Sequence, residues 1–118
     1  SQASPPPPLT PFIMGPIEKR AAELWPGVPV VPILLVGATD GVHTNAAGIP
    51  TYGVSGLFSS SDGDGMHGLN ERVRVKSLYD SRDFLFALVK DYATAKDAPT
   101  TTGKKPGLMG RMLGKLKG

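Results

Sequence analysis

Two short stretches of the chain carry the residue types that could do chemistry. In the first, Gly37-Ala38-Thr39-Asp40, a hydroxyl and a carboxylate come directly after the most apolar run of the sequence. The second centres on His67, which a glycine follows directly and a Glu-Arg pair follows shortly after. Imidazole is the commonest metal ligand among side chains, and hydroxyl and backbone groups suit the binding of a carboxylate or carbonyl. The two stretches are therefore candidates for a metal ligand and a substrate-binding loop.

Both stretches follow segments that read as strands. Val28–Val36 is apolar at nearly every position, which is typical of a strand buried on both faces of a parallel sheet. Ile49–Val54 is the second strand-like segment. Loops that leave the carboxyl ends of adjacent parallel strands lie on one edge of an open α/β sheet. We therefore expect Gly37–Gly41 and Ser55–Gly68 to face a common site.

The remaining segments predict the elements that would flank this sheet. They are a helix from Thr10-Pro11 to the Pro26-Gly27 break, a short helix around Val42–Ala47, a strand at Arg72–Lys76 and a helix over Ser77–Ala93. The expected fold class is α/β, with a small, mostly parallel sheet flanked by helices. A strand that is apolar on both faces must be covered by helices on both faces of its sheet, and the sequence predicts two good helices, which are too few to cover them. We therefore expect this chain to be one part of a larger domain.

Composition divides the chain into a linker, a folded part and a tail. Residues 1–9 are proline-rich and predict an extended linker, residues 10–95 the folded part, and residues 96–118 a disordered basic tail. Five of the thirteen basic residues lie in residues 97–118, so the fold itself is near neutral and predicts no specific nucleic-acid partner. Glycines weaken the tail's amphipathic pattern, which favours a solubilising role over membrane contact.

The absence of cysteine excludes disulfides and thiolate metal sites. No apolar run approaches the ~20 residues that a membrane-spanning helix needs. The expectation is a soluble protein whose compartment, cytoplasm or periplasm, the sequence leaves open.

Four segments, in this order, carry a resemblance to a known family. They are Pro26-Gly27-Val28-Pro29, Gly37-Ala38-Thr39-Asp40-Gly41, Ala47-Gly48-Ile49-Pro50-Thr51-Tyr52-Gly53 and Met66-His67-Gly68-Leu69-Asn70-Glu71-Arg72-Val73. Together they resemble the C-terminal part of the catalytic domain of zinc-dependent metallopeptidases and amidohydrolases. That family includes aminoacylases, carnosine dipeptidases, carboxypeptidase G and succinyl-diaminopimelate desuccinylase. The resemblance covers roughly Pro8 to Ala95.

The resemblance implies a chemistry and a role for each stretch. Family members hold two zinc ions, and a metal-bridging water attacks the amide carbonyl of a small peptide or an N-acyl amino acid, with a glutamate as general base. By resemblance His67 is a terminal zinc ligand. Gly37, Ala38, Thr39 and Asp40 would line the pocket and hold the substrate's carboxylate or carbonyl. A homodimer is compatible with this family.

The chain also departs from the family pattern. The family's His-x-Asp motif, its bridging Asp and its paired glutamates belong upstream, and this sequence has no counterpart of them. Metal-bound water needs two or three protein ligands around each ion. The chain alone is therefore not expected to be a competent hydrolase, and its expected partner is the missing N-terminal part of the catalytic domain. The alternative is a non-catalytic remnant or interaction module that keeps the fold without the activity.

Plainer interpretations of the same residues stay open. His67 could be an ordinary surface imidazole in a glycine-flanked loop, and His43 suits a helix surface better than a ligand role. Asp40 could simply cap the short helix that follows it. Asn70 and Glu71 could either orient His67 or be polar residues at a strand entry.

A calcium loop is a rival interpretation of Ser60–Glu71. Asp62, Asp64, Gly65 and Glu71 stand at the third, fifth, sixth and twelfth places of an EF-hand loop. Ser60 occupies the first place, where the motif has Asp, and strand-like flanks replace the required helices. The sequence therefore favours a flexible surface loop here.

Overall fold

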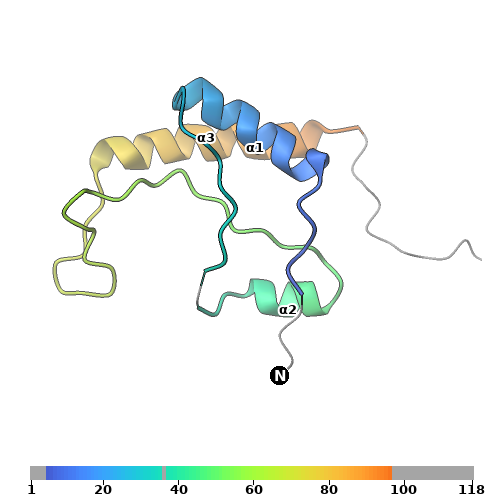
Figure 1. Ribbon diagram of the computed structural model, residues 1–118, viewed down its shortest axis with the longest axis horizontal. Helices are drawn as coiled ribbons and strands as arrows, with labels where there is room; N and C mark the ends of the chain where they lie inside the picture. The colour runs from blue at the N-terminus through green and yellow to red at the C-terminus, as the bar shows by residue number, and fades with distance from the viewer. Residues whose placement is uncertain (1–4, 36, 97–118) are drawn as a thin grey trace, which may run out of the picture.

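Two long helices packed side by side form the body of the molecule. The structure is a computed structural model that describes residues 5–35 and 37–96. Its helices there are α1 (Pro11–Leu24), α2 (Gly41–Ala46) and α3 (Val75–Thr94). Helices α1 and α3 pack against each other, while α2 stands apart, joined to them by long extended segments (Figure 1). None of the described helices is long and apolar enough to cross a lipid bilayer.

Helix α1 begins and ends where the sequence predicts. Thr10 occupies the N-cap position and Pro11 the first turn, where a missing N–H costs nothing. The Thr10 hydroxyl makes no capping hydrogen bond, however, and is buried without a partner. The start therefore comes from the fixed φ of proline more than from a hydroxyl cap. At the other end the chain leaves the helix through Gly27, whose φ of 81° favours glycine.

Helix α3 starts earlier than the sequence predicts. It begins at Val75 rather than at Ser77, so the strand expected at Arg72–Lys76 is wrong. Ser77 is buried inside the helix, where its hydroxyl accepts a hydrogen bond from the Phe58 N–H (2.7 Å) and donates one to the Phe58 carbonyl (3.2 Å). The serine predicted to begin the helix therefore lies inside it and anchors the extended chain at Phe58.

The predicted fold class is wrong for the described residues: no strand forms in 5–35 or 37–96, so the small, mostly parallel sheet is not present. Residues 28–35 and 49–54 are extended but unpaired, and Val36 lies outside the described residues. Ile33 and Leu34 are 73% and 89% exposed. A strand forms only with a neighbour to complete its hydrogen bonds, and the two long helices bury their faces on each other instead.

The core is small and lies between α1 and α3. Ala21, Phe84 and Leu88 are its buried residues, and a ring of partly buried side chains surrounds them: Ile17, Trp25, Val30, Leu85 and Tyr92. The Trp25 ring lies 5.2 Å from that of Phe84 and 4.9 Å from that of Phe58, centroid to centroid. Extended residues on both sides of α2 therefore return to the same aromatic cluster.

A polar contact also joins the two helices. Arg20 on α1 donates two hydrogen bonds to the carboxylate of Asp91 on α3, at 2.7 and 2.6 Å. Both side chains are about three-quarters buried, at 24% and 23% exposure. These hydrogen bonds hold the pKa of Asp91 below its usual range. A paired guanidinium and carboxylate in this fork geometry fix the axial register of α1 on α3.

The ends of the chain are described only in part. The expected basic tail over 96–118 lies outside the described residues apart from Lys96, as do residues 1–4 of the expected linker. Residues 5–9 run beside α2 toward α1 (Figure 1). The Tyr52 hydroxyl donates a 2.6 Å hydrogen bond to the Pro8 carbonyl, which ties this segment to the chain that follows α2.

Candidate functional site

The loop that carries His67 is closed by its own polar groups. The Asp64 carboxylate accepts from the Ser60 N–H at 2.9 Å, and the Asp64 carbonyl accepts from the Arg72 N–H at 2.8 Å. Hydrogen bonds from Ser59 and Ser60, with the positive charges of Arg72 and Arg74, hold the pKa of Asp64 below its ordinary value. Asp64 is therefore ionised at neutral pH and acts as the internal brace of the loop.

His67 lies at the far turn of this loop in an unusual backbone conformation. Its φ is 63°, and it is the one non-glycine residue with positive φ among the described residues. The left-handed region costs an L-residue roughly 1–2 kcal/mol, although histidine tolerates it better than most. The side chain is exposed. The loop thus presents an accessible imidazole at a strained position.

The stretch from Gly37 to Asp40 forms the entry to α2. The Thr39 hydroxyl accepts a hydrogen bond from the Gly41 N–H at 3.3 Å, so this predicted substrate-binding group is used within the turn. Asp40 takes the N-cap position of α2, but its carboxylate makes no capping hydrogen bond. All four residues of this stretch are exposed.

Sequence reasoning missed a polar clamp that fixes α2. The Asn45 amide oxygen accepts from the Thr51 N–H at 2.8 Å, and the Thr44 and Thr51 hydroxyls share a 2.5 Å hydrogen bond. The clamp folds the chain after α2 back onto the helix through Gly48, whose φ is 81°. An asparagine near the end of a short helix with a glycine three residues later was the available signal.

The two candidate stretches do not meet. The His67 loop and the Gly37–Asp40 turn lie on the same side of the α1–α3 layer but belong to separate segments. The loop lies beyond one end of α3 and the turn lies near its middle (Figure 1). No hydrogen bond among the described residues joins them. The sheet that was expected to bring them together is the element that does not form.

The described residues also do not build a metal centre by themselves. They contain no group of three or more His, Cys, Asp or Glu side chains that could hold an ion. The rival calcium loop fails on its own ligands: Asp62 pairs with Arg72 at 2.7 Å, and Asp64 is committed to the backbone of the loop. His67 has the donor chemistry of a zinc ligand, but a complete ligand set needs residues from elsewhere.

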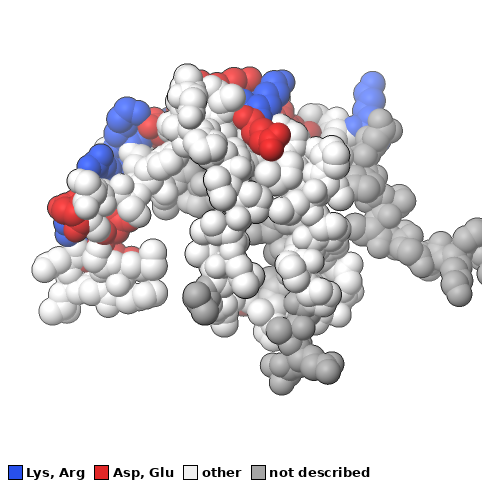
Figure 2. Space-filling model, viewed as in Figure 1, with Lys and Arg blue, Asp and Glu red and all other residues white. Residues whose placement is uncertain are grey.

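Charge is distributed unevenly over the surface. Figure 2 shows that acidic and basic side chains gather over the α1–α3 layer and at the base of the His67 loop. The limbs formed by residues 28–35 and by α2 and its flanks are mostly uncharged in this view. The uncharged part also exposes large apolar side chains, with Leu34 and Leu35 at 89% and 76%.

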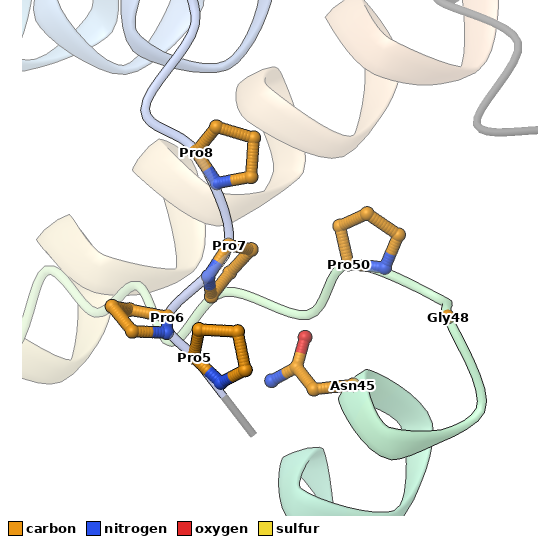
Figure 3. Close-up of a pocket in the computed structure, with 7 residues that line it drawn as sticks. All are labelled: Pro5, Pro6, Pro7, Pro8, Asn45, Gly48 and Pro50. Atoms are coloured by element: carbon orange, nitrogen blue, oxygen red, sulfur yellow. The ribbon is translucent and has the colours of Figure 1, made fainter. Parts of the chain in front are cut away.

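Two shallow grooves border these limbs. Pro5–Pro8 face Asn45, Gly48 and Pro50 across a groove of about 210 Å³ (Figure 3). The second groove, of about 330 Å³, lies where the extended chain after α2 meets the helix pair, and its lining is apolar and aromatic: Phe12, Ile13, Ile17, Tyr52, Val54 and Tyr92. The phenol groups of both tyrosines already donate to backbone carbonyls. Neither groove offers free, convergent polar groups of the kind that orient a polar substrate.

No family model matches this chain, and neither a curated protein nor a solved structure does.

Proposed function

We propose that this chain supplies one zinc-ligand histidine and a substrate-binding loop to a dinuclear zinc metallopeptidase or amidohydrolase acting on small peptides or N-acyl amino acids. The observation that carries the proposal is His67. An accessible imidazole is held in the left-handed region by a loop with its own internal brace, and residues in such conformations cluster at ligand-binding sites. The resemblance of four segments, in order, to the C-terminal part of that family suggests the chemical class.

The role of the chain in this proposal is that of a part. His67 would bind one zinc ion, and Gly37–Asp40 would contact the substrate's carboxylate or carbonyl. The remaining zinc ligands and the general-base glutamate would come from a separate N-terminal part of the catalytic domain. Docking of that part would also have to bring together the two limbs that this chain leaves apart.

Complementation tests the proposal. The chain is co-expressed with an N-terminal catalytic segment of a family member, truncated before its closing His-Gly motif, and hydrolysis of N-acetyl amino acids is measured with zinc. We expect activity only when both parts are present. His67→Ala should abolish it and lower the zinc content, whereas His43→Ala, the matched control, should change neither. Hydrolysis by the chain alone, or activity that survives His67→Ala, would contradict the proposal.

A second candidate function is that of an interaction module without catalysis. The observation that favours it is the exposed apolar limb over residues 30–35, a feature that soluble monomers rarely show and that marks interaction surfaces. The same complementation separates the two candidates. A complex that forms with the N-terminal segment, but binds no more zinc than that segment alone, would favour the interaction module.

A further inference from the structure

The extended limb over residues 30–35 has the properties of a strand without a neighbour. Val31, Ile33, Leu34 and Leu35 are between 65% and 89% exposed. Within the described residues, no backbone N–H or C=O of this limb takes part in a hydrogen bond. An extended backbone with open donors and acceptors is a template for pairing with another chain.

The two edges of this limb are not equivalent. In a strand, successive residues direct their backbone groups to opposite edges. In a strand over residues 30–35, one edge would carry both the N–H and the C=O of Val31, Ile33 and Leu35. The other edge passes through Pro32, which has no N–H to donate. A pairing strand is therefore accepted along the first edge and interrupted along the second.

The competent edge is complementary to a second copy of itself. Two antiparallel strands centred on Ile33 place Ile33 opposite its counterpart and Val31 opposite Leu35 of the other copy. All three donors of each strand are then used, and Pro32 falls at a position whose nitrogen faces away from the partner strand. The cross-strand pairs are branched aliphatic side chains, which pair favourably.

The charge and the size of this limb also indicate what kind of partner can pair with it. No charged residue occurs between Val28 and Thr39, so two copies approach without like-charge repulsion at the contact. A limb of six residues is well below the roughly 20 residues per side of a standard interface. The contact is thus suited to a weak dimer.

We propose that two copies of this chain associate through antiparallel pairing of residues 30–35 along the Val31, Ile33 and Leu35 edge. Pro32 blocks the opposite edge, so the assembly ends at two chains. This interface is independent of the zinc proposal, because it uses neither His67 nor Gly37–Asp40.

Sedimentation velocity of the full chain over a range of concentrations tests the proposal, with two proline variants one residue apart. Ile33→Pro removes an N–H from the pairing edge, whereas Leu34→Pro removes one from the edge that Pro32 already interrupts. Both positions are exposed and extended, and circular dichroism checks that α1 and α3 are retained. We expect a saturating monomer–dimer equilibrium with a micromolar dissociation constant. Ile33→Pro should weaken it at least tenfold, and Leu34→Pro should leave it within about twofold.

Several results would overturn the proposal. A chain that stays monomeric has no such interface, and assembly beyond the dimer shows that Pro32 does not close the second edge. Equal weakening by Ile33→Pro and Leu34→Pro shows association through side chains without strand pairing. Amide hydrogen exchange gives an independent readout, because dimerisation should protect Val31, Ile33 and Leu35 more than Val30 and Leu34.

Discussion

Replacing Gly56 with alanine tests the packing of the extended chain on the helix pair. Gly56 is buried, and a methyl group there would lie 2.7 Å from Cη2 of Trp25, 3.1 Å from Cα of Ser81 and 3.3 Å from Cδ1 of Phe84. The first distance is a clash. The second is to the backbone of α3, which cannot move independently, and the Trp25 ring is itself held between Phe58 and Phe84.

The size of the effect follows from two opposing contributions. Overpacking of a core costs typically 1–3 kcal/mol. The lower conformational entropy of an unfolded chain with alanine offsets about 0.4–1 kcal/mol of that cost. We therefore expect Gly56→Ala to lower the free energy of unfolding by about 1–2 kcal/mol, a decrease in Tm of roughly 5–15 °C for a domain of this size.

Gly53→Ala is the matched control three residues earlier in the same extended segment. A methyl group at Gly53 would meet no atom within 4 Å, and its φ is not in the left-handed region. We expect its free energy of unfolding to be unchanged or slightly raised. Urea denaturation followed by the fluorescence of Trp25, the single tryptophan of the chain, reports on the contact directly. Equal stability of Gly56→Ala and Gly53→Ala would refute the packing of Gly56 between Trp25 and α3.

Two further predictions concern the helix pair and the His67 loop. Arg20 donates hydrogen bonds to the Asp91 carboxylate, so the pKa of Asp91 in the folded protein lies below its value of about 3.9 in an unfolded chain. The Arg20–Asp91 pair therefore contributes stability at pH values above about 3.9, and that contribution is lost as the pH falls through the folded pKa. The difference in stability between the wild type and Asp91→Asn should therefore shrink in acid. Glu23→Gln alters the more exposed partner of Arg20, so its difference from the wild type should be smaller at every pH. Parallel pH profiles of stability for the wild type and Asp91→Asn would contradict the pairing. At the loop, urea denaturation should show His67→Gly to be more stable than His67→Ala by roughly 1 kcal/mol, because only glycine adopts a φ of 63° without strain. Equal stabilities of the two variants would show that the left-handed conformation is absent in solution.

Local signals found the helices but not all of their packing faces. Pro11 and the Pro26-Gly27 break predicted α1, because proline fixes φ and lacks an N–H while glycine readily adopts the positive φ that ends a helix. The predicted helix start at Ser77 was two residues late, and the Ser77 hydroxyl instead bonds to the Phe58 backbone 19 residues away. Phe84 was likewise not predicted to be core, although it is 2% exposed, since its partner Trp25 comes from α1's end.

For the candidate site, too, the local features were predicted and the arrangement in space was not. The sequence placed His67 in a glycine-rich loop and Asp40 at the start of a short helix, and both locations hold. The common edge expected for the two stretches depended on a sheet, and that is the part of the prediction that failed. Neither the φ of His67 nor the Thr44, Asn45 and Thr51 clamp could be derived from residue types, because both depend on how the loops close.

The sequence by itself predicted the three helices of the described residues, although not the start of α3, and it named candidate side chains for a metal or substrate. Helix formation and residue chemistry depend on residues that are close together along the chain. Only the tertiary structure decided that residues 28–35 have no strand beside them and that His67 and Gly37–Asp40 stand on separate limbs. Strand pairing and site assembly need groups that are distant in sequence, and for this apolar limb the described chain does not provide them.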